Sequence, residues 1–163
     1  MPSQEPTSTK IFWRISNYLD LTGEGGRISS ARWHTEGRRV VYLAESPAAA
    51  IVERLVQVLN IKPDGILPRS YQLLRILVAA DLEISELEPP FRVNWKENEA
   101  LTRSLGDAWL SSQQTCLASV PSAVAPYTWN YLLNPEHPDA GQVRIAEVVK
   151  ERFDNRLFRS GGL

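Results

Sequence analysis

Three side chains within residues 27–57, RISSARWHTEGRRVVYLAESPAAAIVERLVQ, are of types that bind charged and aromatic ligands. The guanidinium of Arg32, in a loop after a glycine cluster, can fork onto a phosphate or a carboxylate. The ring of Tyr42, at the end of a strand, can stack on a flat ring. Glu53 lies inside an otherwise almost apolar helix and leans toward the helix N-terminus, over Ala49 and Ala50. A carboxylate beside such a gap suits a binding or catalytic site.

Each of these residues also has an ordinary structural explanation. Glu53 can pair with Arg54 or with another exposed cation at the helix edge. Tyr42 can pack in the core or against a cross-strand neighbour. Arg32 can be a solvated surface residue, and four other arginines lie near it in the sequence: Arg14, Arg27, Arg38 and Arg39. The residue types alone leave both explanations open.

Two polar loops supply further candidates. VPSAVAP (120–126) places Ser122 between prolines at a strand end, and WNYLLNPEHPD (129–139) carries Asn130 and Asn134. Ser and Asn in turns usually bond the local backbone, which is the alternative explanation. The sequence has no GxSxG, GxGxxG or GxxxxGK[ST] motif. Neither an elbow nucleophile nor a Rossmann or P-loop phosphate cradle is therefore predicted.

The elements that must position these residues mix strands and helices. RRVVYLA (38–44) predicts a strand, and Ser46 with Pro47 suits the start of a helix that runs to Asn60. Hydrophobic spacing predicts a second helix over 98–112 and further strands over 10–15, 71–82, 116–124 and 143–149. The other segments are read as loops, turns and a tail: 16–26, 27–37, 64–70, 84–95, 125–139 with a short Trp-Asn-Tyr-Leu-Leu element, and 153–158. Without a steady βαβ alternation, the expected fold class is α+β, a mainly antiparallel mixed sheet core with flanking helices.

Composition sets the outer limits. The chain has 163 residues, 43% apolar and 23% charged, with a net charge of −1. We expect a disordered lead over 1–9 and a single domain over 10–163. The balanced charge opposes direct nucleic-acid binding, and no apolar run is long enough for a membrane helix. The single Cys116 fits a reducing cytoplasm, and with only His34 and His137 beside it no metal site is expected. Both histidines are read as structural or surface residues.

Four motifs together resemble one known family. They are ARWHTEGRRVVYLAESPAAAIVERLV, LTRSLGDAWL, VPSAVAPYTWNYLLNPEHPD and a tail DNRLF. In this order they resemble the RES-domain family, named for an Arg, a Glu and a Ser, and the similarity runs from Ile11 to Phe158. The resemblance implies a fold like that of ADP-ribosyltransferases. It also implies a bacterial toxin that consumes NAD as substrate, by hydrolysis or phosphorolysis or by transfer of ADP-ribose to a protein, with no tightly bound cofactor.

The resemblance carries over residue by residue. The family Arg falls on Arg32, the Tyr on Tyr42, the Glu on Glu53 and the Ser on Ser122, while Asn130 and Asn134 fall in the family's Asn-rich segment. His34 departs from the pattern, since many members have Asn there. The implied roles are a pyrophosphate clamp for Arg32, a nicotinamide platform for Tyr42 and stabilisation of an oxocarbenium-like ribose by Glu53. The Ser and Asn side chains would bind amide or ribose groups.

The resemblance also implies a partner and leaves three functions to compare. The partner would be an Xre-like antitoxin, with the chain as a homodimer inside a toxin–antitoxin complex. The first function is NAD cleavage that arrests growth, and the second is ADP-ribosylation of a host protein. The third is a catalytically silent module that only binds its antitoxin. Intact Arg32, Tyr42 and Glu53 favour an enzyme over a silent module.

Overall fold

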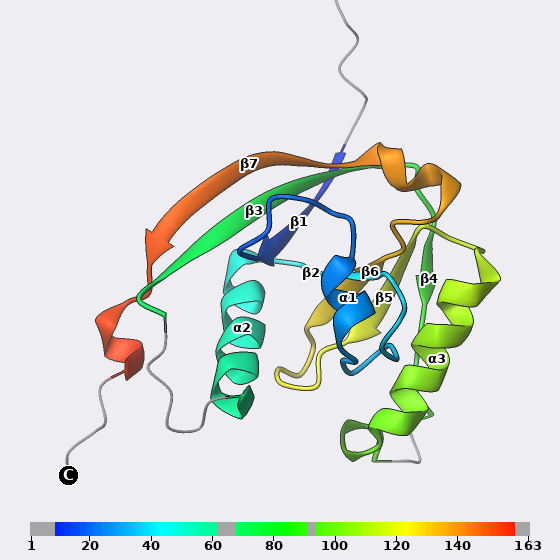
Figure 1. Cartoon of the computed structure of the whole chain (residues 1–163), viewed down its shortest axis with the longest axis horizontal. Helices are drawn as coiled ribbons and strands as arrows, with labels where there is room; N and C mark the ends of the chain where they lie inside the picture. The colour runs from blue at the N-terminus through cyan, green and yellow to red at the C-terminus, as the bar shows by residue number, and fades with distance from the viewer. Residues whose placement is uncertain (1–8, 62–67, 91–93, 159–163) are drawn as a thin grey trace, which may run out of the picture.

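The computed structural model describes residues 9–61, 68–90 and 94–158, which form one seven-stranded sheet with helices on its flanks (Figure 1). The strands are β1 (Thr9–Ile15), β2 (Val41–Ala44), β3 (Ser70–Ala79), β4 (Ile84–Glu86), β5 (Leu117–Pro121), β6 (Trp129–Leu133) and β7 (Val143–Arg152). The α-helices are α1 (Glu24–Ile28), α2 (Pro47–Ile61) and α3 (Glu99–Ser112). The 3₁₀ helices are η1 (Trp95–Glu97), η2 (Pro138–Gln142) and η3 (Asn155–Phe158).

The strand order is β4-β5-β6-β2-β1-β3-β7. Only β4 and β5 pair in parallel among the described strands, and every other neighbouring pair is antiparallel. The sheet is therefore mixed and mainly antiparallel, and the expected α+β class is confirmed.

The sheet buries apolar side chains on both faces, because successive residues of a strand point to opposite sides. One cluster contains Val41 and Leu43 of β2 together with Val143 of β7 and Leu117 of β5. Strands from distant positions in the sheet order share this cluster, which requires the sheet to curve strongly, as Figure 1 shows. The second cluster contains Trp33 and residues of α3, β5 and β6. Helix α3 therefore covers the other face.

Between β1 and β2 the sheet parts. The two strands pair at one register position, Trp13 with Ala44, whereas β1 pairs with β3 along its whole length. Helix α2 packs against both β1 and β2. The parting therefore leaves space between the two strands that α2 borders.

The two long helices begin as the sequence predicts. The Ser46 hydroxyl accepts a hydrogen bond from the Ala49 amide (3.1 Å) at the start of α2. The Asn98 side chain accepts one from the Leu101 amide (3.1 Å) at the start of α3. Such caps satisfy amide groups that have no partner inside the helix.

Among the described α-helices and strands, two were not predicted. Helix α1 lies in segments read as loops, because a Gly-rich sequence has low helix propensity. Two glycines, at its N-cap and within it, permit close packing: a Cβ on Gly23 would lie 2.7 Å from the Val40 amide nitrogen, and one on Gly26 would lie 2.7 Å from the Arg38 carbonyl oxygen. Strand β4, in the segment 84–95 that was read as irregular, has three residues and depends on pairing with β5.

Some expectations fall outside the described residues. Of the expected lead over 1–9, only Thr9 is described, as the first residue of β1, and the turn expected over 64–70 is described only from 68 onward. Among the described helices, none has the length and apolar character that crossing a bilayer requires.

Candidate active site

A cleft with a volume of about 290 Å³ lies where β1 and β2 part. Its walls come from β1 and the loop after it, from α1 and the segment after it, which includes His34, from β2, from α2 and from Asn130 of β6. A concave site bordered by several elements with a few polar groups is the usual form of a ligand site. Of the six site residues expected from the sequence, the cleft lining includes Tyr42, Glu53 and Asn130.

Glu53 is held in the cleft wall by two residues far away in the sequence. Its Oε1 accepts hydrogen bonds from the Ser122 hydroxyl (2.7 Å) and from the Asn130 amide group (2.9 Å). Ala50, one turn earlier on α2, is buried and also lines the cleft, so the carboxylate does lie beside a small side chain. No ion pair between Glu53 and Arg54 occurs among the described residues, which argues against the surface-pair explanation.

Ser122 orients Glu53 and has little capacity left for other chemistry. Its hydroxyl donates to Glu53 and accepts from the backbone amides of Val124 and Ala125, both at 3.1 Å. The side chain is 4% exposed. A hydroxyl has one proton and two lone pairs, and these three bonds use them all. Ser122 therefore fixes the loop after β5 and the carboxylate together.

Asn130 faces Glu53 with the donor end of its side-chain amide. A carboxylate only accepts, so the amide NH₂ of Asn130 must face Glu53. Its Oδ1 is buried and has no hydrogen-bond partner among the described residues. An unpaired buried acceptor costs stability, which is typical of groups kept for function.

Tyr42 is part of the cleft lining, while its hydroxyl is bonded to the protein. The hydroxyl accepts from the Trp33 amide (3.1 Å) and lies 2.8 Å from His34 Nδ1. Burial, with a smaller effect of Asp107, raises the pKa of Tyr42 well above its ordinary value. The phenol therefore stays protonated at neutral pH.

Arg32 and Asn134 lie apart from this cluster. One Arg32 guanidinium nitrogen donates to the Lys96 carbonyl (2.9 Å) and the other lies 4.0 Å from Glu99 Oε1. Asn134 is 2% exposed, and its Oδ1 accepts from the Glu136 amide (3.0 Å). Neither residue is part of the cleft lining. The clamp role of Arg32 and the ligand role of Asn134 stay predictions.

Two cations that the sequence did not single out line the cleft, Arg14 of β1 and Arg54 of α2. Arg14 donates to the Asp20 carbonyl (3.3 Å), and burial lowers the pKa of its guanidinium, with Asp20 opposing that effect. An arginine remains charged in proteins all the same. The sequence signal for Arg14 is a cation that lies between Trp13 and Ile15 in a predicted strand.

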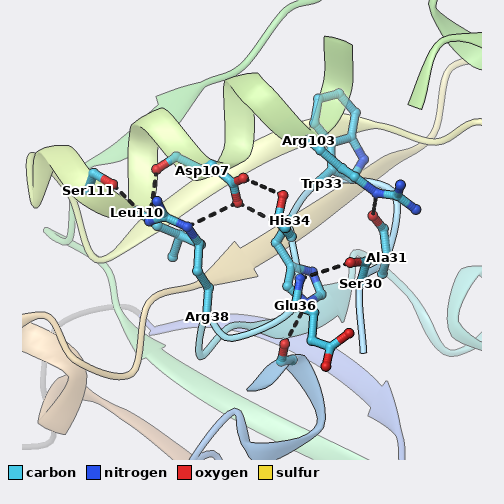
Figure 2. A network of polar contacts seen from close by, with 12 residues as sticks. Ser30, Ala31, Trp33, His34, Glu36, Arg38, Arg103, Asp107, Leu110 and Ser111 are labelled. Carbon is cyan, nitrogen blue, oxygen red and sulfur yellow. Dashed lines mark hydrogen bonds and ion pairs between the residues drawn. The ribbon is translucent and has the colours of Figure 1, made fainter. Parts of the chain in front are cut away.

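The backbone of the Arg32 segment is fixed by α3 (Figure 2). The Thr102 hydroxyl donates to the Arg32 carbonyl (2.6 Å), and Arg103 Nε donates to the Ala31 carbonyl (2.8 Å). Both donors lie on the helix turn that faces the loop. The sequence motif LTRSLGDAWL therefore supplies contacts to the ARWH motif.

One turn later, α3 makes a second set of contacts to the same segment. A Cβ on Gly106 would overlap the Trp33 carbonyl oxygen, so only glycine permits this approach. Asp107 accepts from the Thr35 amide (3.0 Å) and hydroxyl (2.6 Å), and its Oδ1 lies 3.4 Å from Arg38 Nε. Figure 2 shows the Asp107 side chain extending from α3 toward Arg38. The helix thus fixes residues 31–35 from both ends.

Comparison with known proteins identifies the family. Residues 11–155 match the RES domain. "Toxin Res" of Pseudomonas putida (strain KT2440) is 44% identical over 148 residues, covering 91% of this chain and 99% of the relative. "Prs ADP-ribosylating toxin" of Sphingobium sp. (strain YBL2) is 36% identical over 162 residues, covering 93% and 98%. A chain in the crystal structure of the M. tuberculosis MbcT-MbcA toxin-antitoxin complex has the same fold, with a TM-score of 0.65 over 89% of this chain and 85% of that chain at 20% identity. The extent of the domain match and the identity to these relatives show that this chain belongs to the RES domain family.

Proposed function

We propose that this chain is the toxin of a toxin–antitoxin pair and cleaves NAD between nicotinamide and ribose. The observation that carries the proposal is the Glu53 carboxylate, held by Ser122 and Asn130 in the wall of the cleft. Breaking this bond develops positive charge on the ribose, and a preorganised carboxylate stabilises such charge.

The bond changes are simple. The bond between ribose C1′ and the nicotinamide nitrogen breaks, and its electron pair leaves with the neutral nicotinamide. A new C1′–O bond forms to water or phosphate, and the acceptor's proton goes to solvent. The ring of Tyr42 would stack on the nicotinamide.

For the pyrophosphate the geometry favours Arg14 and Arg54 over Arg32. Both line the cleft, whereas the Arg32 guanidinium is bonded to the Lys96 carbonyl. Forked guanidinium groups are well suited to phosphate oxygens. Arg32 would serve as the clamp only if it left that carbonyl on binding.

A second candidate is transfer of ADP-ribose to a protein. The name of the Sphingobium relative, an ADP-ribosylating toxin at 36% identity, favours it. The same C1′–N bond breaks in both reactions, so Glu53 and Tyr42 keep their roles. What differs is the nucleophile that attacks C1′.

The test of the activity is direct. Purified protein is incubated with NAD, with and without phosphate, and the products are separated by chromatography. Free ADP-ribose indicates hydrolysis, and a phosphate adduct of ADP-ribose indicates phosphorolysis. Labelled NAD added to a bacterial lysate detects modified protein. If no nicotinamide is released under any condition, the proposal is wrong.

The structural neighbour comes from a toxin-antitoxin complex, and this supports a partner for this chain. We propose an Xre-like antitoxin, bound to a homodimer of this chain in the cytoplasm. Expression of the chain alone in bacteria should arrest growth and lower NAD, and co-expression of the adjacent antitoxin gene should restore both. Normal growth on strong solo expression would contradict this proposal.

A further inference from the structure

His34 connects the wall of the cleft to Tyr42. Its side chain is 2% exposed and lies in the segment that α3 fixes. The Nε2 atom lies 3.0 Å from the carbonyl oxygens of Gly26 and Ser29, at the end of α1. The Nδ1 atom lies 2.8 Å from the Tyr42 hydroxyl. Figure 2 shows the imidazole below α3, between the loop and α1.

These contacts determine where the protons are. Carbonyl oxygens only accept, so Nε2 must carry the imidazole proton. In the neutral ring Nδ1 is then an acceptor, and the Tyr42 hydroxyl must donate to it. The same hydroxyl accepts from the Trp33 amide (3.1 Å). Its direction is therefore fixed by two protein groups.

We propose that His34 is a positioning residue that holds the Tyr42 ring in the cleft through the acceptor at Nδ1. This inference deepens the proposed function, because it assigns the support of the residue that would stack on nicotinamide. Among the described residues, the Tyr42 hydroxyl has no other acceptor for its proton.

The arrangement requires neutral His34. A proton on Nδ1 would turn this atom from an acceptor into a donor and would displace the Tyr42 proton. The charged groups that face His34 are Asp107 and Arg103 of α3, which oppose each other, and the titratable group on β2 is the neutral phenol of Tyr42. Burial lowers the pKa of His34 from its ordinary value. Activity should therefore hold at neutral pH and fall only in acid.

Two substitutions of His34 distinguish the roles of the two imidazole nitrogens. In His34→Asn the amide oxygen occupies the position of Nδ1, so Tyr42 keeps an acceptor while the bonds to α1 are lost. In His34→Gln the amide NH₂ reaches the α1 carbonyls, and Tyr42 loses its acceptor. We expect His34→Asn to keep kcat near that of the parent and His34→Gln to lose about tenfold, as for one unpaired buried hydrogen-bonding group.

The controls and readouts make the outcome decisive. His137→Asn, at a histidine outside the cleft lining, should match the parent. In a pH series of NAD cleavage, the acid loss assigned to His34 should be absent from His34→Asn. Circular dichroism melts confirm that each variant is folded. If the Gln variant is active and the Asn variant is not, or if both lose equally, His34 only anchors α1 and the proposal is wrong.

A spectroscopic readout works without any activity. Two-bond ¹H–¹⁵N correlations of ¹⁵N-histidine protein should show the Nε2-protonated tautomer for the signal that His34→Asn removes. Tyr42→Phe removes a donor that favours the neutral ring, so the pKa of His34 should rise. An Nδ1-protonated ring, or an unchanged pKa, overturns the positioning role. Correct NMR results without NAD cleavage would instead refute only the proposed function.

Discussion

At the residue scale, Glu53 has one oxygen occupied and one available. Oε1 accepts from Ser122 and Asn130, whereas Oε2 has no hydrogen-bond donor within the described residues. The first oxygen fixes the orientation of the carboxylate, and the second can face a ribose. This division allows a carboxylate to be rigid before the ligand arrives, and preorganisation is what makes electrostatic stabilisation effective.

Glu53→Gln should abolish turnover and leave the fold intact. The amide oxygen can still accept from Ser122 and Asn130, so the thermal midpoint and the dissociation constant for NAD should stay close to the parent's. The negative charge that we propose to stabilise the ribose is lost, which typically costs about 10²–10³ in rate. Because that charge acts in the transition state, kcat falls and binding does not. Timed assays of NAD cleavage measure the fall in kcat, and calorimetry measures the binding of NAD.

The matched control is Glu45→Gln. Glu45 is exposed and lies just before the Ser46 cap of α2. Its charge favours the helix dipole by a few tenths of a kcal/mol at most, so turnover should be unchanged. If Glu45→Gln abolishes cleavage while Glu53→Gln does not, the catalytic carboxylate has been assigned to the wrong residue.

Ser122→Ala should lower both stability and turnover. The substitution frees the amides of Val124 and Ala125 and removes one of the two donors to Glu53. Unpaired amides cost about 1–3 kcal/mol when they stay buried, so the thermal midpoint should fall. Turnover should fall less than in Glu53→Gln, since Asn130 still holds the carboxylate.

Thr128→Ala, in the same loop, separates this effect from simple loop damage. Its hydroxyl donates to the Pro126 carbonyl (3.2 Å) and is not bonded to Glu53. This variant should change kcat little. A Ser122→Ala protein with the turnover of the parent would show that Ser122 does not orient the carboxylate.

A comparison of two arginines identifies the pyrophosphate clamp. Arg14→Lys should raise the KM for NAD by roughly tenfold, because the lysine keeps the charge but loses the fork. Arg32→Lys should change KM less, since this guanidinium bonds to Lys96 and lies outside the cleft lining. Arg27→Lys, whose exposed side chain pairs with Glu24 at 2.8 Å, is the control. The reverse order for Arg14 and Arg32 would restore the clamp to Arg32, and equal losses from all three would indicate a diffuse basic surface.

Of the residues grouped by the resemblance, the structure joins some by hydrogen bonds, whereas Arg32 and Asn134 lie outside the cleft lining. Glu53, Ser122 and Asn130 were expected together from the resemblance, and the structure joins them by hydrogen bonds. Short side chains on regular elements have few directions open to them. An arginine has several rotatable bonds, so whether Arg14 or Arg32 faces the cleft depends on carbonyls from other elements.

At the element scale, α3 determines the position of residues 31–35. Its first turns supply the Thr102 and Arg103 donors, and the next turn supplies Gly106 and Asp107. Helix residues four apart share a face, so Thr102 and Gly106 meet the loop in one row. The helix lies outside the cleft, yet it fixes the backbone from which Arg32 and His34 project.

Gly106→Ala should destabilise the fold by about 3 kcal/mol, at the upper end for an added methyl in a packed site. The new Cβ would overlap the Trp33 carbonyl, and neither backbone can move without loss of the α3 contacts. The thermal midpoint should fall by roughly 6–12 °C. Gly141→Ala is the control, because nothing lies within 4 Å of its Cβ position. Equal midpoints for the two variants would mean that α3 and the loop are not closely packed.

Local signals predicted α2 and α3 because both have capping side chains and regular apolar spacing. They did not predict α1 or β4. Helix α1 has five residues, and Gly26 together with the N-cap Gly23 serves packing against residues 38–40 and not helix propensity. Strand β4 exists because β5 is available to pair with it. Such short elements depend on tertiary contacts, which a local pattern does not contain.

At the scale of the whole molecule, the cleft results from the parting of β1 and β2. These strands lie at the centre of the sheet order and yet pair at one position. The sequence predicted both strands and the mainly antiparallel sheet. It did not predict their divergence, because strand register depends on contacts between distant residues. The candidate site is therefore a property of topology as much as of its residues.

Acid should destabilise the whole fold in two separate steps, of which the first belongs to His34. Burial lowers the pKa of His34 in the folded protein, while in the unfolded chain it is about 6.5. As pH falls below that value, His34 binds a proton in the unfolded chain but not in the folded protein, so the free energy of unfolding decreases. The loss ends once the pH is below the folded pKa.

Carboxylates give the second step at lower pH. Hydrogen bonds from Thr22 lower the pKa of Asp20, and those from Arg27 lower that of Glu24. Their stabilising effect is present above their ordinary pKa values near 4 and is lost as pH falls through the folded values. Thermal midpoints of the parent from pH 8 to 3 should thus fall first below about 6.5. His34→Asn should lose the first step and retain the second. A parent protein whose midpoint is constant between pH 7 and 5 would show that His34 is not held neutral in the fold.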